Sequence, residues 1–185
     1  MIPNPIDIST HVTPRLSALI ERLVNDPDAD EPPTLGTVRD FFTGLLPPAF
    51  GEADSLAALA QFKAADTIVI GAPMYNFTIP SQLKAWIDRV LVAGETFRYT
   101  ATGAEGLMGD KRVIVAVARG GLYGEDSDQR AIEHAERYLA DVFAFIGVTD
   151  LTFVVAEGLK ISEDARLAAM MAAHDRVARL RPVAA

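Results

Sequence analysis

The 185-residue sequence contains no cysteine, which excludes disulfide bonds, thiolate nucleophiles and cysteine-ligated metal sites. It has only three histidines, His11, His134 and His174, and they stand too far apart to match a metal-binding motif. No apolar run approaches the length of a membrane-spanning helix, and the N-terminus lacks the basic-then-apolar pattern of a signal peptide. We therefore expect a cytoplasmic protein with no metal centre and no membrane contact.

Positive charge is also scarce, because 17 Lys and Arg residues stand against 25 Asp and Glu residues, for a formal net charge of −8. A surface of this sign repels the phosphates of nucleic acids and of anionic lipids, so we expect neither as a partner. Half of the residues are hydrophobic, which excludes a disordered chain. The length predicts a single domain over residues 1–185.

Three apolar runs without polar alternation indicate strands that are buried on both faces of a parallel sheet. They cover residues 67–70, 112–118 and 151–155, and shorter candidates lie at residues 6–8 and 35–39. Segments with apolar residues at helical spacing separate these strands. This alternation predicts a three-layer α/β sandwich with a five-stranded parallel sheet and helices on both faces.

Local signals mark where two of the helices begin or end. Gly147 follows a helical pattern and is expected to stop that helix, whereas Ser162 is expected to cap the last one. By contrast, residues 101–109 are rich in glycine and predict a loop excursion from the core.

The stretch after the first long apolar run combines a strand end, a loop and a helix start. Gly71 and Pro73 end the strand, residues 74–77 form a loop of bulky and amide side chains, and Pro80 opens a helix. In an open α/β sheet, ligands bind at the carboxyl ends of the strands. A loop with two aromatic rings, a methionine and an amide at this place suits a flat, apolar ring with polar edges.

Four motifs in the chain resemble the FMN-dependent NADH-azoreductases, which are also described as NADH:quinone reductases. The motifs are Ala72-Pro73-Met74-Tyr75-Asn76-Phe77 with Ser81-Gln82-Leu83-Lys84, Gly94-Glu95-Thr96-Phe97-Arg98-Tyr99-Thr100 with Glu105-Gly106-Leu107, Arg119-Gly120-Gly121, and Phe145-Ile146-Gly147 with Ala156-Glu157-Gly158. The resemblance extends over roughly the last two thirds of the chain. It implies a flavodoxin-like fold, FMN and NADH or NADPH as cofactors, quinone or azo compounds as acceptors, and a homodimer with the flavin near the interface.

The resemblance also implies a site across the carboxyl ends of the strands. Asn76 and Tyr75 are expected to orient the ring or the substrate and are the catalytic candidates, while Phe97 and Tyr123 are expected to line the substrate pocket. The expected cofactor contacts come from three segments and are Ser9, Pro73, Met74, Tyr75, Asn76, Phe77, Ala118, Arg119, Gly120 and Gly121.

Several of these residues have a second interpretation in the sequence. A Gly-Gly pair is also common in ordinary turns, although glycines after a central strand let the backbone approach a ligand closely. Phe97 could instead hold its loop on the domain surface. Glu157 could serve the site or bond nearby main-chain amides.

The loop that should bind the FMN phosphate is several residues shorter than in the family it resembles. Ser9 aligns with that loop and Thr10 and Thr13 could replace missing hydroxyls, but the same three residues could simply cap a helix. Two alternatives to the enzyme follow. One is a non-enzymatic binding or regulatory dimer that has lost strong FMN binding, and the other is a one-electron carrier of the flavodoxin type.

Overall fold

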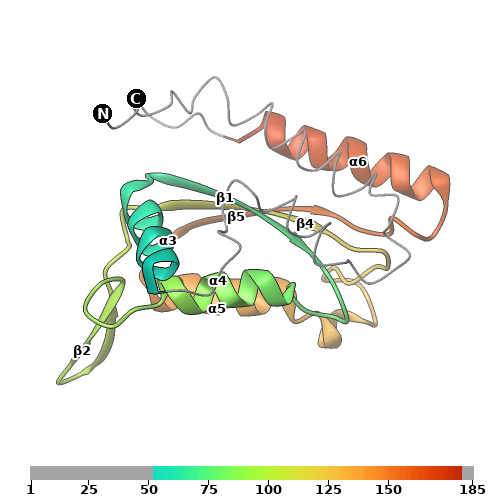
Figure 1. Cartoon of the computed structure of the whole chain (residues 1–185). Helices are drawn as coiled ribbons and strands as arrows, with labels where there is room; N and C mark the ends of the chain where they lie inside the picture. Colours follow the sequence, from blue (N-terminus) through green and yellow to red (C-terminus); the bar gives the residue numbers. More distant parts are fainter. Residues whose placement is uncertain (1–51, 181–185) are drawn as a thin grey trace.

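The computed structural model describes residues 52–180 (Figure 1). The strand candidates at 6–8 and 35–39 and the hydroxyl residues Ser9, Thr10 and Thr13 lie outside the described residues. The elements follow in the order α3 (Glu52–Ala64), β1 (Thr67–Pro73), α4 (Ser81–Val90), β2 (Phe97–Thr100), β3 (Gly103–Gly106), β4 (Arg112–Ala118), the 3₁₀ turn η1 (Arg130–Ile132), α5 (Ala135–Phe145), β5 (Asp150–Ala156) and α6 (Glu163–Ala178).

The central sheet within residues 52–180 has three parallel strands in the order β1-β4-β5. Thr67 of β1 pairs with Arg112 of β4, which in turn pairs with Asp150 of β5, so the strands begin and end together. The three long apolar runs are thus confirmed as strands, and the middle one is almost completely buried. The expected end of the first strand at Gly71 is wrong, because β1 continues through Gly71 to Pro73 in register with Ala116 and Ala118 of β4. Of the five parallel strands that we expected, these three fall in the described part of the chain.

Helices cover both faces of this sheet, as the three-layer prediction requires (Figure 1). On one face, α4 and α5 bury Leu83, Ile87, Leu139 and Phe143, and α3 packs beside α4. On the other face, α6 buries a narrower stripe that contains Val177. Complete burial of one large apolar side chain contributes about 1.5–3 kcal/mol. Among residues 52–180, the larger cluster under α4 and α5 therefore contributes more than the stripe under α6.

The segment predicted as a loop excursion forms an antiparallel hairpin of β2 and β3. It projects from the edge of the sheet where the strands begin (Figure 1, far left). Its base is fixed because the Met108 amide donates to the Ile146 carbonyl at 2.8 Å and because Gly106 lies directly against the backbone of Gly147. The buried Lys111 ammonium lies at the same edge and donates to the carbonyls of Lys63 and Ala65, each at 2.9 Å, where α3 ends.

None of the helices in residues 52–180 combines the length and apolar character needed to cross a lipid bilayer.

Candidate functional site

The loops that follow β1 and β4 leave the sheet side by side. The Met74 amide donates to the Ala118 carbonyl at 2.8 Å, which extends the β1–β4 pairing past the end of the strand. Beyond that point, the rings of Phe77 and Tyr123 meet edge to face with their centroids 6.3 Å apart. The two motifs at the carboxyl edge of the sheet are therefore in direct contact.

The first loop is a tight turn over residues 75–78. The amide of Tyr75 donates to the Thr78 carbonyl at 3.0 Å, and the amide of Thr78 donates back at 3.1 Å. Both central residues have positive φ, 47° for Asn76 and 71° for Phe77, as in a type I′ turn.

Phe77 is an unusual residue for this conformation. Left-handed backbone is common for asparagine but costs on the order of 1–3 kcal/mol for a bulky side chain. Two contacts offset the strain, because the Phe77 carbonyl accepts from the His134 amide at 2.9 Å and its ring packs on Tyr123. The ring of Phe77 is still 44% exposed. Strain of this kind concentrates at ligand sites, and the exposed face of Phe77 is available to a ligand.

The second loop carries Gly120 and Gly121, and its first three carbonyls face the loop after β5. The carbonyls of Arg119, Gly120 and Gly121 accept from the amides of Leu159, Lys160 and Gly158, respectively, at 2.9–3.3 Å. In a trans peptide the carbonyl and the next N–H point in opposite directions, and the described residues contain no cis peptide. The amides of Gly120 and Gly121 therefore point away from the β5 loop, toward the side of β4 on which β1 lies.

Neither of these two glycine amides has a hydrogen-bond partner within the described part of the chain. A main-chain donor that is shielded from water and unpaired is costly, so it is normally satisfied by protein, water or a ligand. The site thus presents two adjacent N–H donors on one side and an aromatic turn on the other. Such an arrangement can bind a flat ring whose edge accepts hydrogen bonds.

The side chain of Arg119 does not take part in this surface, because the residue is only 4% exposed. Its guanidinium donates to Glu136 at 2.5 Å and, from Nε, to one oxygen of Glu157 at 3.0 Å, while Nη2 forms an ion pair with that same oxygen at 2.9 Å. Its main chain is bonded as well, since the amide donates to the Ala156 carbonyl at 3.0 Å. As a cofactor contact, Arg119 stays a prediction, and the observed role of its side chain is to tie the loop to neighbouring elements.

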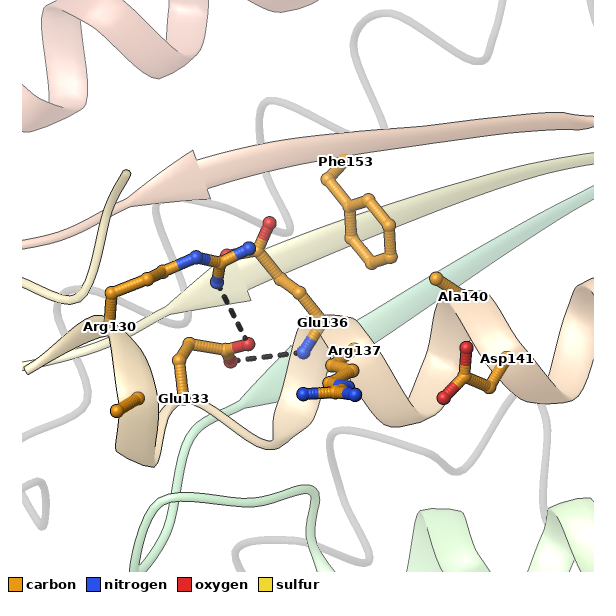
Figure 2. A pocket seen from close by; sticks show the side chains of 8 residues that line it. Arg130, Glu133, Glu136, Arg137, Ala140, Asp141 and Phe153 are labelled. Carbon is orange, nitrogen blue, oxygen red and sulfur yellow. Dashed lines mark hydrogen bonds and ion pairs between the residues drawn. The ribbon is translucent and has the colours of Figure 1, made fainter. Parts of the chain in front are cut away.

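Glu133 and Glu136, which surround the Arg119 guanidinium, were not predicted as part of this region. Glu133 accepts from the amides of Ala135 and Glu136, each at 3.0 Å, and so caps the start of α5. Figure 2 shows the Glu133 carboxylate between the first turn of α5 and Arg130, which donates to it at 3.3 Å. The sequence signal for this cluster is an arginine that follows a buried strand, because a buried guanidinium needs carboxylates nearby.

A hollow of about 550 Å³ lies on the outer side of this cluster, between α5 and the edge strand β5 (Figure 2). The carboxylates of Glu133 and Glu136 at its wall are already paired with arginines. The lining consists of charged side chains of both signs with one aromatic ring, and its members are Arg130, Ala131, Glu133, Glu136, Arg137, Ala140, Asp141 and Phe153.

The predicted site residues thus fall into three groups. Those after β1 and β4, including Tyr123, come together at the carboxyl edge, with Ala118 buried beneath them. Phe97 does not join them, since it is 8% exposed and packs on Phe145 at the opposite edge with ring centroids 4.7 Å apart. Ser9 lies outside the described residues.

A family model described as the flavodoxin-like fold matches residues 11–180 of this sequence. The chain belongs to this flavodoxin-like family. In flavodoxin-like sheets, ligands bind outside the carboxyl ends of the strands, which is the edge where the two loops meet here.

Within the flavodoxin-like family, the sequence is most usefully compared with curated NADH:quinone oxidoreductases. The chain is 60% identical over 121 residues to FMN-dependent NADH:quinone oxidoreductase 2 of Bradyrhizobium diazoefficiens, a match that covers 65% of this chain and 60% of that protein. The match therefore spans less than two thirds of that relative's length.

Two solved azoreductase structures are similar in fold to this chain over nearly its whole length. Azoreductase AzrA is 27% identical with a TM-score of 0.65 over 97% of this chain and 96% of its own. An FMN-dependent NADH-azoreductase from Bacillus anthracis, solved in complex with FMN, is 25% identical with a TM-score of 0.63 over 94% and 93% of the two chains.

Proposed function

We propose that this protein is an FMN-dependent NADH:quinone oxidoreductase that also accepts azo compounds. The observation that carries the proposal is the pair of amides at Gly120 and Gly121, which have no hydrogen-bond partner among residues 52–180 and are directed toward the side of the strained aromatic turn at residues 75–78. The names of the relatives in both comparisons point to the same chemistry. The negative net charge also fits a small-molecule substrate better than a nucleic acid or an anionic membrane.

The residues at the carboxyl edge fit the isoalloxazine ring of FMN. The polar edge of that ring carries acceptors for main-chain donors, and Gly120 and Gly121 supply two such donors on adjacent residues. Its apolar faces would contact the turn through Met74 and Phe77, with Pro73 beneath. Ser9 and its neighbours would hold the phosphate through hydroxyls and main-chain amides, without a positive charge.

The protein's own contribution to the reaction is placement and exclusion of water. When bound, FMN would accept a hydride from NADH or NADPH and deliver it to the quinone or azo acceptor, and the two substrates would use one pocket in turn with ping-pong kinetics. Asn76, exposed at the tip of the turn, offers an amide that can donate to or accept from the substrate. Tyr75 and Tyr123 border the same space and would orient the ring and close the pocket around it.

We also propose that the active form is a cytoplasmic homodimer in which residues 1–185 form one domain with a five-stranded parallel sheet. The hairpin of β2 and β3 supports the dimer, because it lies at the opposite edge of the sheet and cannot reach the carboxyl edge of its own chain. Phe97 on this hairpin is buried in its own domain, whereas Tyr99 is 75% exposed. If the hairpin aromatics line a substrate pocket, that pocket belongs to a second copy of the chain.

The experiment that tests this function is purification of the full chain followed by reconstitution with FMN. We expect a yellow protein that oxidises NADH in the presence of a quinone, with a much slower rate when no acceptor is added. A colourless protein that excess FMN cannot reconstitute would refute the enzymatic proposal and leave the non-enzymatic dimer.

Replacement of Asn76 tests its role within that reaction. Asn76→Gly removes the amide but tolerates positive φ, so the turn should keep its shape and the thermal midpoint should change by only a few degrees. Turnover should fall about tenfold or more, the effect expected for a group that orients the reacting partners. If the loss of turnover is fully accounted for by a large fall in the thermal midpoint, Asn76 serves the fold alone.

A further inference from the structure

Glu157 lies just after β5 and contacts the loop after β4 at two points. One of its oxygens accepts from the main-chain amide of Tyr123 at 2.9 Å. The same oxygen accepts from Nε of Arg119 at 3.0 Å and forms an ion pair with Nη2 of Arg119 at 2.9 Å. These two partners flank Gly120 and Gly121 in the sequence, so one carboxylate holds both ends of the segment whose two glycine amides are unbonded within residues 52–180.

The contacts of Tyr123 extend this arrangement to the turn after β1. Its ring lies against Gly121, since a methyl group built on that glycine would come within 3.0 Å of the ring. The Arg119 guanidinium lies 5.8 Å from the ring centroid, and Phe77 meets the ring at its edge. The position of Tyr123 therefore determines both the shape of the glycine segment and the support of the strained Phe77.

We infer that Glu157 is a positioning residue for FMN binding, which acts by fixing the loop of Gly120, Gly121 and Tyr123 in its binding shape; this inference rests on the proposed function. Glu157 itself does not need to touch the cofactor. Its carboxylate is paired with Arg119, which it shares with Glu136. Its bond to the Tyr123 amide restrains the loop before FMN binds, so less conformational entropy is lost on binding. Pre-organisation of this kind raises affinity without adding a contact to the ligand.

Glu136 provides a matched control within the same chain. Its carboxylate is bonded to the same guanidinium. Among the described residues, it has no hydrogen bond or ion pair with Tyr123 or the glycine segment. Glu157→Gln and Glu136→Gln each remove one charge from the Arg119 cluster with almost no change in shape. The two variants should therefore lose similar stability, whereas only Glu157→Gln weakens the bond to the loop.

The test measures FMN binding to the cofactor-stripped full-length chain by quenching of flavin fluorescence. We expect the dissociation constant for FMN to rise about tenfold in Glu157→Gln, which corresponds to 1.4 kcal/mol, and to stay within about twofold of wild type in Glu136→Gln. Visible circular dichroism of the bound flavin should change in Glu157→Gln alone. Hydrogen exchange in the protein without FMN should be faster at the Tyr123 amide of that variant.

The outcomes separate this inference from the proposed function. Failure of the wild-type chain to bind FMN refutes both. Wild-type binding that Glu157→Gln leaves unchanged, or that both variants weaken equally, refutes only the positioning role of Glu157. If Glu157→Gln does not fold by far-ultraviolet circular dichroism, Glu157→Asp tests the same bond, because it keeps the charge but is one methylene too short to hold the Tyr123 amide and Arg119 together.

Discussion

A methyl group added at Gly121 should have a different effect from one added at the neighbouring Gly120. Neither glycine has positive φ, so alanine is compatible with the backbone at both positions. At Gly121 the new Cβ would lie 3.0 Å from Cε2 and 3.3 Å from Cζ of the Tyr123 ring. At Gly120 it would lie 3.2–3.4 Å from the flexible aliphatic stem of Lys160. The first neighbour is held in place, and the second can move aside.

The size of the difference follows from these distances. Carbon atoms in contact prefer a separation of about 3.5–4.0 Å, so the Tyr123 ring must move by roughly 0.5–1 Å. Its movement is limited by Phe77 at its edge and Arg119 near its face. Overpacking of this kind costs about 1–3 kcal/mol. The entropy that alanine removes from the unfolded chain is the same in both variants and cancels in the comparison.

The free energy of unfolding should therefore be about 1–3 kcal/mol lower in Gly121→Ala than in Gly120→Ala. For a protein of this size, that difference corresponds to roughly 2–12 °C in the thermal midpoint, measured by circular dichroism on the protein without FMN. Affinity for FMN should also fall further in Gly121→Ala, because Tyr123 moves with the loop. Equal midpoints for the two variants would show that the ring does not lie against Gly121, and the site geometry argued from that contact would be wrong.

Three further predictions concern the folded chain itself. Lys111→Met removes the donor to two part-buried carbonyls at the end of α3, so urea unfolding should show a loss of about 1–3 kcal/mol. Gly106→Ala would force a side chain into the backbone at Gly147, and little soluble protein or a loss of more than about 3 kcal/mol is expected from thermal unfolding. Burial raises the pKa of Tyr138 above its ordinary value of 10.0. The folded state therefore holds this proton more tightly, and its stability should be retained below pH 10 and fall as the pH rises through the raised pKa, less so in Tyr138→Phe, as followed by alkaline unfolding.

Local patterns predicted the central strands and several element ends. The three apolar runs became β1, β4 and β5 because a strand buried on both faces must be apolar at every position. Gly147 has a φ of 93°, as expected for the residue that ends a helix, and the Ser162 hydroxyl accepts from the Ala165 amide at 3.1 Å at the start of α6. Each of these features depends on residues within one turn of the position concerned.

Features that depend on distant partners could not be predicted in the same way. Arg119 turns away from the ligand edge because its partners are Glu136 and Glu157, 17 and 38 residues further along the chain. The left-handed conformation of Phe77 opposes the preference of its own side chain and depends on contacts with His134 and Tyr123. None of these four partners is evident from the residues beside Arg119 or Phe77.

The motif that contains Phe97 did not predict at which edge of the sheet this residue lies. Its segment lies between α4 and β4, and a chain that leaves a helix at the amino edge of the sheet can turn in many directions. The direction is fixed by the pairing of β2 with β3 and by the close approach of Gly106 to Gly147. Both contacts hold the hairpin at the amino edge, so the ring of Phe97 packs into its own domain rather than against the loops at the other edge.

The direction of a main-chain amide at this site depends on strand topology, whereas the direction of a side chain depends on its distant contacts. Strand order and direction fix which edge of the sheet the loops share, and the peptide plane then fixes where the amides of Gly120 and Gly121 point. A side chain at the same edge can rotate toward whatever charge or cavity the rest of the fold supplies, as Arg119 does. A ligand bound mainly through main-chain donors and ring stacking can thus be inferred from topology and a few glycines. The residues that select its acceptor cannot be inferred in this way, because their directions are set by contacts across the whole domain.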